Sequence, residues 1–145
     1  MKYILIVVIC LLHIGCNRPA KIPQLNLQLK HTNTNHYKLR SLVNIKWNRL
    51  YICPPYTYTG MFDDYVLPYI DQVMNTGIRQ RDDICVLLFF NDKKMVAQSV
   101  VSRDIDFASI AKVDKEHHLI HLTPDEEIGW VKADHGYYKV KLTQQ

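Results

Sequence analysis

The sequence predicts an α+β domain, an antiparallel sheet of five or six strands with one main helix packed on it. Three observations support this fold class. Residues 84–90 (ICVLLFF) form an unbroken apolar run, and residues 95–102 return from it as a second strand-like run. Residues 137–142 alternate in polarity, as a half-buried strand does. Residues 59–76 repeat apolar side chains at helical spacing.

The first strand and the helix occupy the first half of the domain. A strand is expected at residues 47–53 (WNRLYIC), and the Pro-Pro at residues 54–55 ends it. A helix is expected after Thr59, which suits the N-cap, and before Gly77, which suits the C-terminal end. Pro68 cannot donate its backbone hydrogen bond, so we expect a kink or a break into two short helices. The apolar stripe of this helix would consist of Phe62, Val66, Ile70 and Val73.

A hairpin follows the helix. The run at residues 84–90 does not alternate, which predicts a strand buried on both faces. Residues 91–94 (NDKK) supply a turn, so the two runs read as a β-hairpin. Residues 104–111 are expected to form a short helix or a loop, and residues 117–122 (HHLIHL) a third strand.

The C-terminal part begins with a helix-start pattern. Residues 123–126 (TPDE) combine a cap, a first-turn proline and a capping-box acid, which predicts one helical turn before a strand through residues 129–131. Residues 134–136 then turn the chain into the strand at residues 137–142. Alternation places Tyr138, Val140 and Leu142 on one face of this strand and Tyr137, Lys139 and Lys141 on the other.

The N-terminus has the pattern of a secretory signal peptide. A cationic start precedes an apolar run of ten residues at positions 3–12, and His13-Ile14-Gly15-Cys16 follows. This pattern resembles the bacterial lipoprotein signal, although His13 stands where leucine is usual. The resemblance implies that Cys16 carries fatty acyl chains such as palmitate and becomes the first mature residue. The alternatives are an ordinary secretory signal, or an uncleaved membrane helix, for which about 20 apolar residues are needed.

These features divide the chain into three parts. Residues 1–15 are expected to be a lipoprotein signal peptide, residues 16–36 the lipidated cysteine and a flexible polar tether, and residues 37–145 a single α+β domain. The chain would then be attached to a bacterial membrane in the cell envelope. By the same resemblance, Asn17 after the cysteine favours the outer membrane, on its periplasmic side or at the surface, if the source has one.

Charge argues against nucleic acid as a partner. Without Lys2 the mature chain has 17 basic and 14 acidic residues, and the charges of both signs are interspersed. The remaining length of about 130 residues suffices for one hydrophobic core. Cys53 and Cys85 both lie in apolar strand-like segments. In an oxidising compartment they are candidates for a disulfide, and the equal alternative is two buried thiols.

No catalytic, metal or cofactor motif stands out. His117, His118 and His121 form a cluster, but on a strand His117 and His121 would be about 13 Å apart and His118 would face the other way. The acids at residues 125–127 could act as general acid and base, although such runs at turns are usually solvated. The chain also lacks a glycine-rich phosphate loop and a nucleophile elbow. We therefore expect no enzyme, no metal and no cofactor.

The most unusual segment is the aromatic one at residues 47–58. Trp47, Tyr51, Tyr56 and Tyr58 surround the Pro-Pro, and aromatic side chains beside a rigid turn suit recognition of a peptide or a sugar. The alternative is that Trp47 and Tyr51 belong to the core and the prolines only end a strand.

The segment WNRLYICPPYT at residues 47–57, together with the hairpin ICVLLFFNDKKMVAQSVV, resembles small bacterial lipoproteins and secreted proteins of no known function. The likeness covers residues 45–107. Its pattern is a tryptophan-acid-x-aromatic strand that ends in a Pro-Tyr-Thr turn, and this chain departs from it at Asn48, where an acid is expected. The resemblance implies no activity.

Taken together, these features predict a membrane-anchored envelope lipoprotein that works as a non-enzymatic binding or envelope-maintenance module. Its partners would be the membrane, through Cys16, and a protein or glycan. One alternative is an inhibitor or immunity protein against an envelope-targeting toxin or hydrolase. A second alternative is a hydrolase that uses the stretch from His117 to Glu127.

Overall fold

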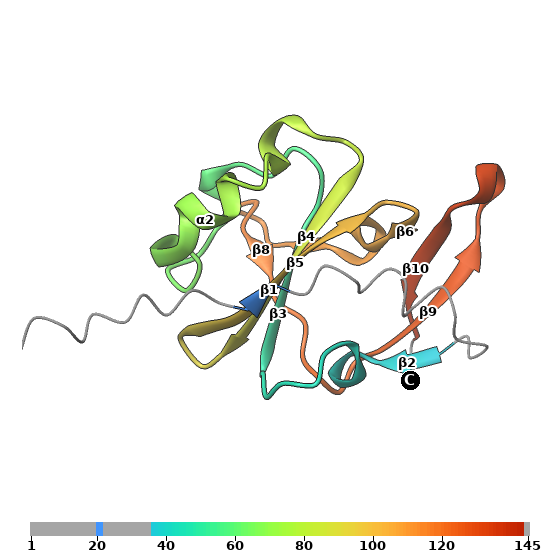
Figure 1. The fold of residues 1–145 in the computed structure, drawn as a ribbon, viewed down its shortest axis with the longest axis horizontal. Coiled ribbons are helices and arrows are strands. Elements are labelled where there is room, and N and C mark those ends of the chain that lie inside the picture. The colour runs from blue at the N-terminus through green and yellow to red at the C-terminus, as the bar shows by residue number, and fades with distance from the viewer. Residues whose placement is uncertain (1–19, 22–35, 144–145) are drawn as a thin grey trace, which may run out of the picture.

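The computed structural model describes residues 20–21 and 36–143 and arranges them in layers around a central sheet (Figure 1). The central sheet has the strand order β1-β5-β4-β3, and a second sheet has the order β2-β9-β10-β6. The central strands are β1 (Ala20–Lys21), β3 (Arg49–Cys53), β4 (Ile84–Asn91) and β5 (Lys94–Ser102). The strands of the second sheet are β2 (His36–Lys38), β6 (Ile105–Asp106), β9 (Glu127–Lys132) and β10 (Tyr138–Leu142).

The fold is mostly β and broadly α+β, as predicted, but the prediction of one five- or six-stranded sheet is wrong. The strands divide between two four-stranded sheets and a two-stranded sheet of β7 (Lys112–Val113) and β8 (Leu119–Ile120). The pairing is also mixed, because β1 runs parallel to β5 and β6 runs parallel to β10. The division follows from β4, which has apolar side chains on both faces and so needs a covering layer on each.

Each face of the central sheet has its own hydrophobic cluster. Alternation along β4 sends Leu87 into the cluster shared with the second sheet and Leu88 into the cluster shared with the helical segments. The first cluster includes Ile128 of β9 and Val140 of β10. The prediction of a strand buried on both faces is therefore confirmed, and its position fixes the order of the layers.

The hairpin is confirmed as an antiparallel pair of β4 and β5, with a register shift between Phe89 and Phe90. Its turn contains Asp92, whose φ of 54° is in the left-handed region. Asn48 holds this turn from the neighbouring strand end. Its amide nitrogen donates to the Asp92 carboxylate at 2.8 Å, and its amide oxygen accepts from the Asp92 backbone N–H at 3.0 Å. An aspartate at position 48 could accept but not donate, which gives Asn48 a structural role.

The helical region is broken, as Pro68 predicted. Two 3-10 turns, η3 (Thr59–Met61) and η4 (Leu67–Tyr69), precede the short helix α2 (Ile70–Met74), and Pro68 lies in the first turn of η4. The main helix of the prediction is thus reduced to about one and a half turns of α-helix. Gly77 ends the segment with a φ of 80°, a conformation that favours glycine. A further 3-10 turn, η5 (Ile78–Gln80), leads to β4.

Two predictions for the C-terminal part are wrong. Residues 123–126 form a turn in which Glu126 N–H donates to the Thr123 carbonyl at 3.3 Å, and no helical turn follows. The capping-box acid is nevertheless confirmed, because the Glu126 carboxylate accepts from the Thr123 N–H at 2.6 Å. The strand expected at residues 117–122 is reduced to β8 and a bridge between Leu122 and Leu50, because His117 has a φ of 67° that no strand adopts.

The alternation of β10 is confirmed, with Val140 buried and both lysines exposed. The 3-10 turn η6 (Phe107–Ile110) packs against β10. Two other 3-10 turns are η2 (Leu39–Leu42) and η7 (Asp134–Gly136).

Part of the expected tether pairs with the fold. Ala20–Lys21 forms the edge strand β1 beside Ala97 and Gln98 of β5. The remainder of the tether before residue 36, the signal peptide and Cys16 lie outside the described residues. Within the described residues, no helix has the length and apolar character needed to cross a membrane.

Candidate functional site

The aromatic turn, residues 54–60, is fixed to the body of the domain. It begins where β3 meets the two prolines, and the Tyr56 backbone N–H donates to the Ile78 carbonyl at 3.0 Å. The Thr57 hydroxyl donates to the Pro54 carbonyl at 2.6 Å, and Thr57 is completely buried. The backbone of the turn is therefore held by hydrogen bonds from inside, which leaves neighbouring side chains free to face solvent.

Two tyrosine rings stand on this turn. Tyr56 is 59% exposed and Tyr58 is 47% exposed, in contrast to most large apolar side chains of the described domain. Tyr56 has a φ of 63°, an unfavourable conformation for a bulky side chain, so the surrounding contacts must hold it there. A Cβ atom at Gly60 would lie 2.9 Å from the Tyr58 ring, so this ring lies close over the glycine. Both rings are thus presented by a defined backbone.

Trp47 and Tyr51 do not belong to this surface: the alternative that both are core residues is confirmed, and a four-residue aromatic surface is wrong for them. Trp47 is 6% exposed and packs edge-on against Phe89, with ring centroids 5.4 Å apart. Tyr51 is 0% exposed and packs edge-on against Phe90 at 5.5 Å. The two side chains lie in different core clusters. The apolar area of each ring is better removed from water than presented to a ligand.

A polar cluster lies beside the buried Tyr51. The Tyr51 hydroxyl donates to the Asp63 carboxylate at 2.6 Å, and Asp63 also accepts from the Tyr65 backbone N–H at 3.1 Å. The Arg49 guanidinium lies 4.1 Å from the centroid of the Tyr65 ring, and the His121 ring lies 5.7 Å from that of Tyr51. These contacts join β3 to the helical layer. The polar side chains of the cluster therefore stabilise the packing of the two layers.

Burial and charge set the protonation of this cluster. Burial raises the pKa of Tyr51 far above its usual value, and the Asp63 carboxylate adds to the effect, so the hydroxyl remains a donor. Burial lowers the pKa of His121, and the nearby Arg49 lowers it further. His121 is thus held neutral near pH 7 and packs as an aromatic ring.

The three histidines of the predicted cluster do not converge. His117 is exposed at the turn between β7 and β8, while His118 faces Asp114, with its Nδ1 3.3 Å from the carboxylate. Among the described residues, Asp114, Glu116 and His118 are the group that could hold a metal ion, since their ligand atoms lie within 4.8 Å of one another. All three are solvent-accessible, and hydrogen bonds between His118 and Asp114 already hold these two side chains in place.

The acids proposed for acid–base chemistry form ion pairs instead. Asp125 pairs with Arg40, Glu126 pairs with Lys112 at 3.6 Å, and Glu127 pairs with Lys38 at 3.9 Å. These pairs join residues 125–127 to the first segments of the domain and to β7.

Cys53 and Cys85 are free and buried. Cys53 is paired in register with Val86, the neighbour of Cys85, but the two side chains point to opposite faces of the central sheet and lie in different clusters. This arrangement favours the alternative of two buried thiols over the disulfide. Burial raises the pKa of Cys53 above its usual range, and burial together with Asp106 raises that of Cys85 to about 11, so neither is a reactive thiolate at neutral pH.

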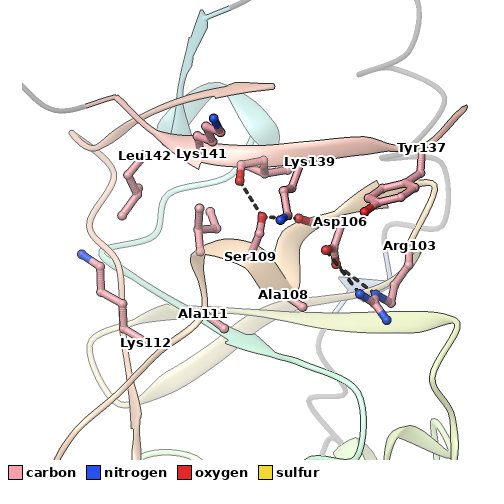
Figure 2. A pocket seen from close by; sticks show the side chains of 12 residues that line it. Arg103, Asp106, Ala108, Ser109, Ala111, Lys112, Tyr137, Lys139, Lys141 and Leu142 are labelled. Atoms are coloured by element: carbon pink, nitrogen blue, oxygen red, sulfur yellow. Dashed lines mark hydrogen bonds and ion pairs between the residues drawn. The ribbon is translucent and has the colours of Figure 1, made fainter. Parts of the chain in front are cut away.

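A hollow of about 760 Å³ lies between η6 and β10, and Figure 2 shows the side chains that line it. Arg103 and Lys112 lie on opposite sides of the opening in this view. The sequence placed Tyr137, Lys139 and Lys141 on one face of β10, and this face contributes to the lining. The position of η6 beside β10, where Ser109 contacts the Val140 carbonyl, had no signal in the sequence, so the hollow could not be predicted.

Comparisons of the chain with protein-family models, with curated protein sequences and with solved structures find no match.

Proposed function

We propose that this protein is a membrane-anchored envelope lipoprotein whose domain binds a protein or glycan partner through the aromatic turn, without catalysis. The observation that carries the proposal is the pair of exposed rings, Tyr56 and Tyr58, on a turn whose backbone is fixed from inside. Aromatic side chains supply a large contact area with only two rotatable side-chain bonds, so their ordering costs little on binding.

The strained backbone at Tyr56 strengthens the argument. A left-handed conformation at a tyrosine costs of order 1–3 kcal/mol, and residues with such backbone strain cluster at binding and catalytic sites. The hydrogen bond from Tyr56 N–H to Ile78 and the buried Thr57 hold the strained conformation. A ring on a backbone that is fixed before binding loses less freedom on association than a ring on a mobile loop.

The place of β1 supports a domain close to the membrane. If Cys16 is acylated, only residues 17–19 separate the anchor from Ala20, which pairs with β5. A stretch of four residues from Cys16 to Ala20 spans at most about 14 Å. The central sheet edge would then stay near the headgroups, and the reach of the aromatic turn would be limited to partners at the membrane surface.

The anchor is tested by replacing Cys16 with serine. We expect Cys16→Ser to move the protein from the membrane fraction to the soluble fraction and to abolish labelling with a clickable fatty acid. The domain should remain folded, because Cys16 is remote in sequence from both core clusters. Equal fatty-acid labelling of the wild type and the variant would refute the lipoprotein part of the proposal.

The binding surface is tested by a photo-crosslinking amino acid in living cells. The crosslinker replaces Tyr56 in one variant and Val131, which is 50% exposed on β9, in a matched control. We expect a discrete adduct from position 56 and not from position 131, and we expect Tyr58→Ala to reduce its yield. The absence of an adduct at position 56, or the same adduct at both positions, would contradict the proposed surface.

The identity of the adduct separates the binding module from the inhibitor or immunity protein. If the crosslinked partner is a toxin or hydrolase whose activity falls when the purified chain is added, the protein is an inhibitor. We propose no enzymatic role for the stretch from His117 to Glu127. Its histidines face different neighbours, and the carboxylates of residues 125–127 are engaged in ion pairs.

A further inference from the structure

The hollow between η6 and β10 has an excess of positive charge. Four cationic side chains line it, and Asp106 is the one carboxylate among its lining residues. Asp106 is already neutralised by Arg103, whose Nε and Nη2 donate to the two carboxylate oxygens at 3.0 and 3.3 Å. The four cations are Arg103, Lys112, Lys139 and Lys141. With Asp106 included, the formal charge of the lining is +3, four cations less one carboxylate.

Two of these cations have no compensating carboxylate. Lys112 pairs with Glu126, but within residues 20–21 and 36–143 neither Lys139 nor Lys141 has an ion-pair partner. The two are separated by one residue on the outward face of β10, so their Cα atoms are about 7 Å apart. Figure 2 shows Lys139 extending from the strand toward η6. An anion with several oxygen atoms between their flexible ammonium groups could accept hydrogen bonds from both.

The walls of the hollow are held in place without a ligand. The Ser109 hydroxyl lies 2.7 Å from the Asp106 carbonyl and 2.5 Å from the Val140 carbonyl, and these contacts join η6 to β10. The Arg103–Asp106 pair fixes one end, and Asp106 is only 4% exposed. The size of the hollow is within the range of about 300–1,000 Å³ typical of small-molecule sites.

We propose that this hollow binds a phosphorylated small ligand, with the phosphate between Lys139 and Lys141. A phosphate carries up to two negative charges and three terminal oxygens, which match two lysine ammonium groups. The apolar parts of Ile110 and Leu142 in the lining would contact the organic part of the ligand. The phosphate could belong to a lipid headgroup or to a free phosphomonoester, and these sources share the chemistry of recognition.

The test uses the protection of lysines from acetylation, measured by mass spectrometry on the purified full chain in neutral detergent. Lys93 and Lys94 of the β4–β5 turn are exposed and serve as internal controls. Glycerol 3-phosphate should slow acetylation of Lys139 and Lys141 several-fold in a saturable manner and leave the controls unchanged. Sodium chloride at the same ionic strength should protect neither pair. Equal protection of both pairs by glycerol 3-phosphate, or protection of neither, would overturn the proposal.

Variants provide the second readout. The Lys139→Gln/Lys141→Gln protein should bind glycerol 3-phosphate at least ten-fold more weakly in a calorimetric titration. The control Lys93→Gln/Lys94→Gln, with the same change in net charge, should bind as the wild type does. Equal affinity of the two double variants would refute the site. Lys139→Arg/Lys141→Arg keeps the charge and should retain binding, which separates loss of the ligand contacts from a folding defect.

The two phosphate sources are distinguished in vesicles. In the full chain reconstituted into phosphatidylcholine vesicles, added phosphatidylglycerol should protect Lys139 and Lys141 selectively if a lipid headgroup is the ligand. Protection by glycerol 3-phosphate alone, without an effect of phosphatidylglycerol, would assign the site to a free phosphomonoester. The site is independent of the aromatic turn, so Tyr56→Ala should leave both results unchanged.

Discussion

Replacement of two adjacent leucines in β4 tests the layered architecture directly. Leu87 and Leu88 are both fully buried, but Leu87 faces the second sheet and Leu88 faces the helical layer. If each face of the central sheet is covered by a packed layer, Leu87→Ala and Leu88→Ala should each lower the free energy of unfolding by about 2–5 kcal/mol. This loss combines the transfer energy of the deleted isopropyl group with the cost of the cavity that remains.

The expected shift is large enough to measure in urea. With a denaturant slope of about 2 kcal/mol/M, a loss of about 3 kcal/mol lowers the unfolding midpoint by about 1.5 M. Val100→Ala is the matched control, because Val100 lies on β5 of the same sheet and is partly exposed. A surface substitution of this kind should change stability by about 0.5 kcal/mol or less.

The layered fold would be refuted if only one of the two leucine variants lowered the unfolding midpoint. If Leu88→Ala shifted the midpoint no more than Val100→Ala does, the helical segments would not cover that face of β4. The same result for Leu87→Ala would mean that the second sheet does not pack on the central sheet. The slope should stay constant in all three variants, since a changed slope reports a change in the surface exposed on unfolding.

Three further predictions concern single side chains. Asn48→Asp should lower stability by about 0.5–2 kcal/mol in urea unfolding, because it removes the amide donor to Asp92 and places two carboxylates together; an unchanged midpoint would contradict the role of Asn48. Without reductant, Cys53 and Cys85 should resist a thiol reagent in the native protein and react after unfolding, whereas a disulfide would leave both unlabelled. Burial lowers the pKa of His121 in the folded state, so the unfolded state binds more protons and stability should fall as the pH drops below the ordinary value of 6.5. His121→Gln should weaken this dependence of the urea midpoint on pH, and an identical pH profile would exclude His121 as its source.

Much of the local structure was encoded in short-range patterns. The uninterrupted apolar run of β4 predicted a strand buried on both faces, and the NDKK turn predicted the hairpin with β5. Pro68 predicted the break between η4 and the preceding segment. Proline has no backbone N–H, so it cannot donate a helical hydrogen bond in any tertiary context. The alternation of β10 likewise predicted which of its side chains face outward. These features depend on backbone chemistry and on neighbours within a few residues.

The burial of the aromatic residues could not be predicted from such local patterns. Trp47, Tyr51, Tyr56 and Tyr58 share one chemistry and one short segment, yet two are buried and two are exposed. The division depends on what packs against each: Trp47 meets Phe89 of β4, while the Tyr56 backbone is held by Ile78. These partners lie some 20 to 40 residues away in sequence, so no local pattern could assign the two exposed rings.

The sequence by itself predicted the strands β3, β4, β5, β9 and β10, the break in the helical region, and an N-terminal pattern that indicates export and lipidation. Only the tertiary structure divided the strands among separate sheets, placed Cys53 and Cys85 on opposite faces, and brought η6 beside β10, where both line one hollow. The physical reason is that element formation follows local backbone preferences, whereas the choice of neighbours follows from the burial of apolar area on both faces of β4. The surface hollow lined by Lys139 and Lys141 forms only when η6 packs beside β10, so it depends on the tertiary structure.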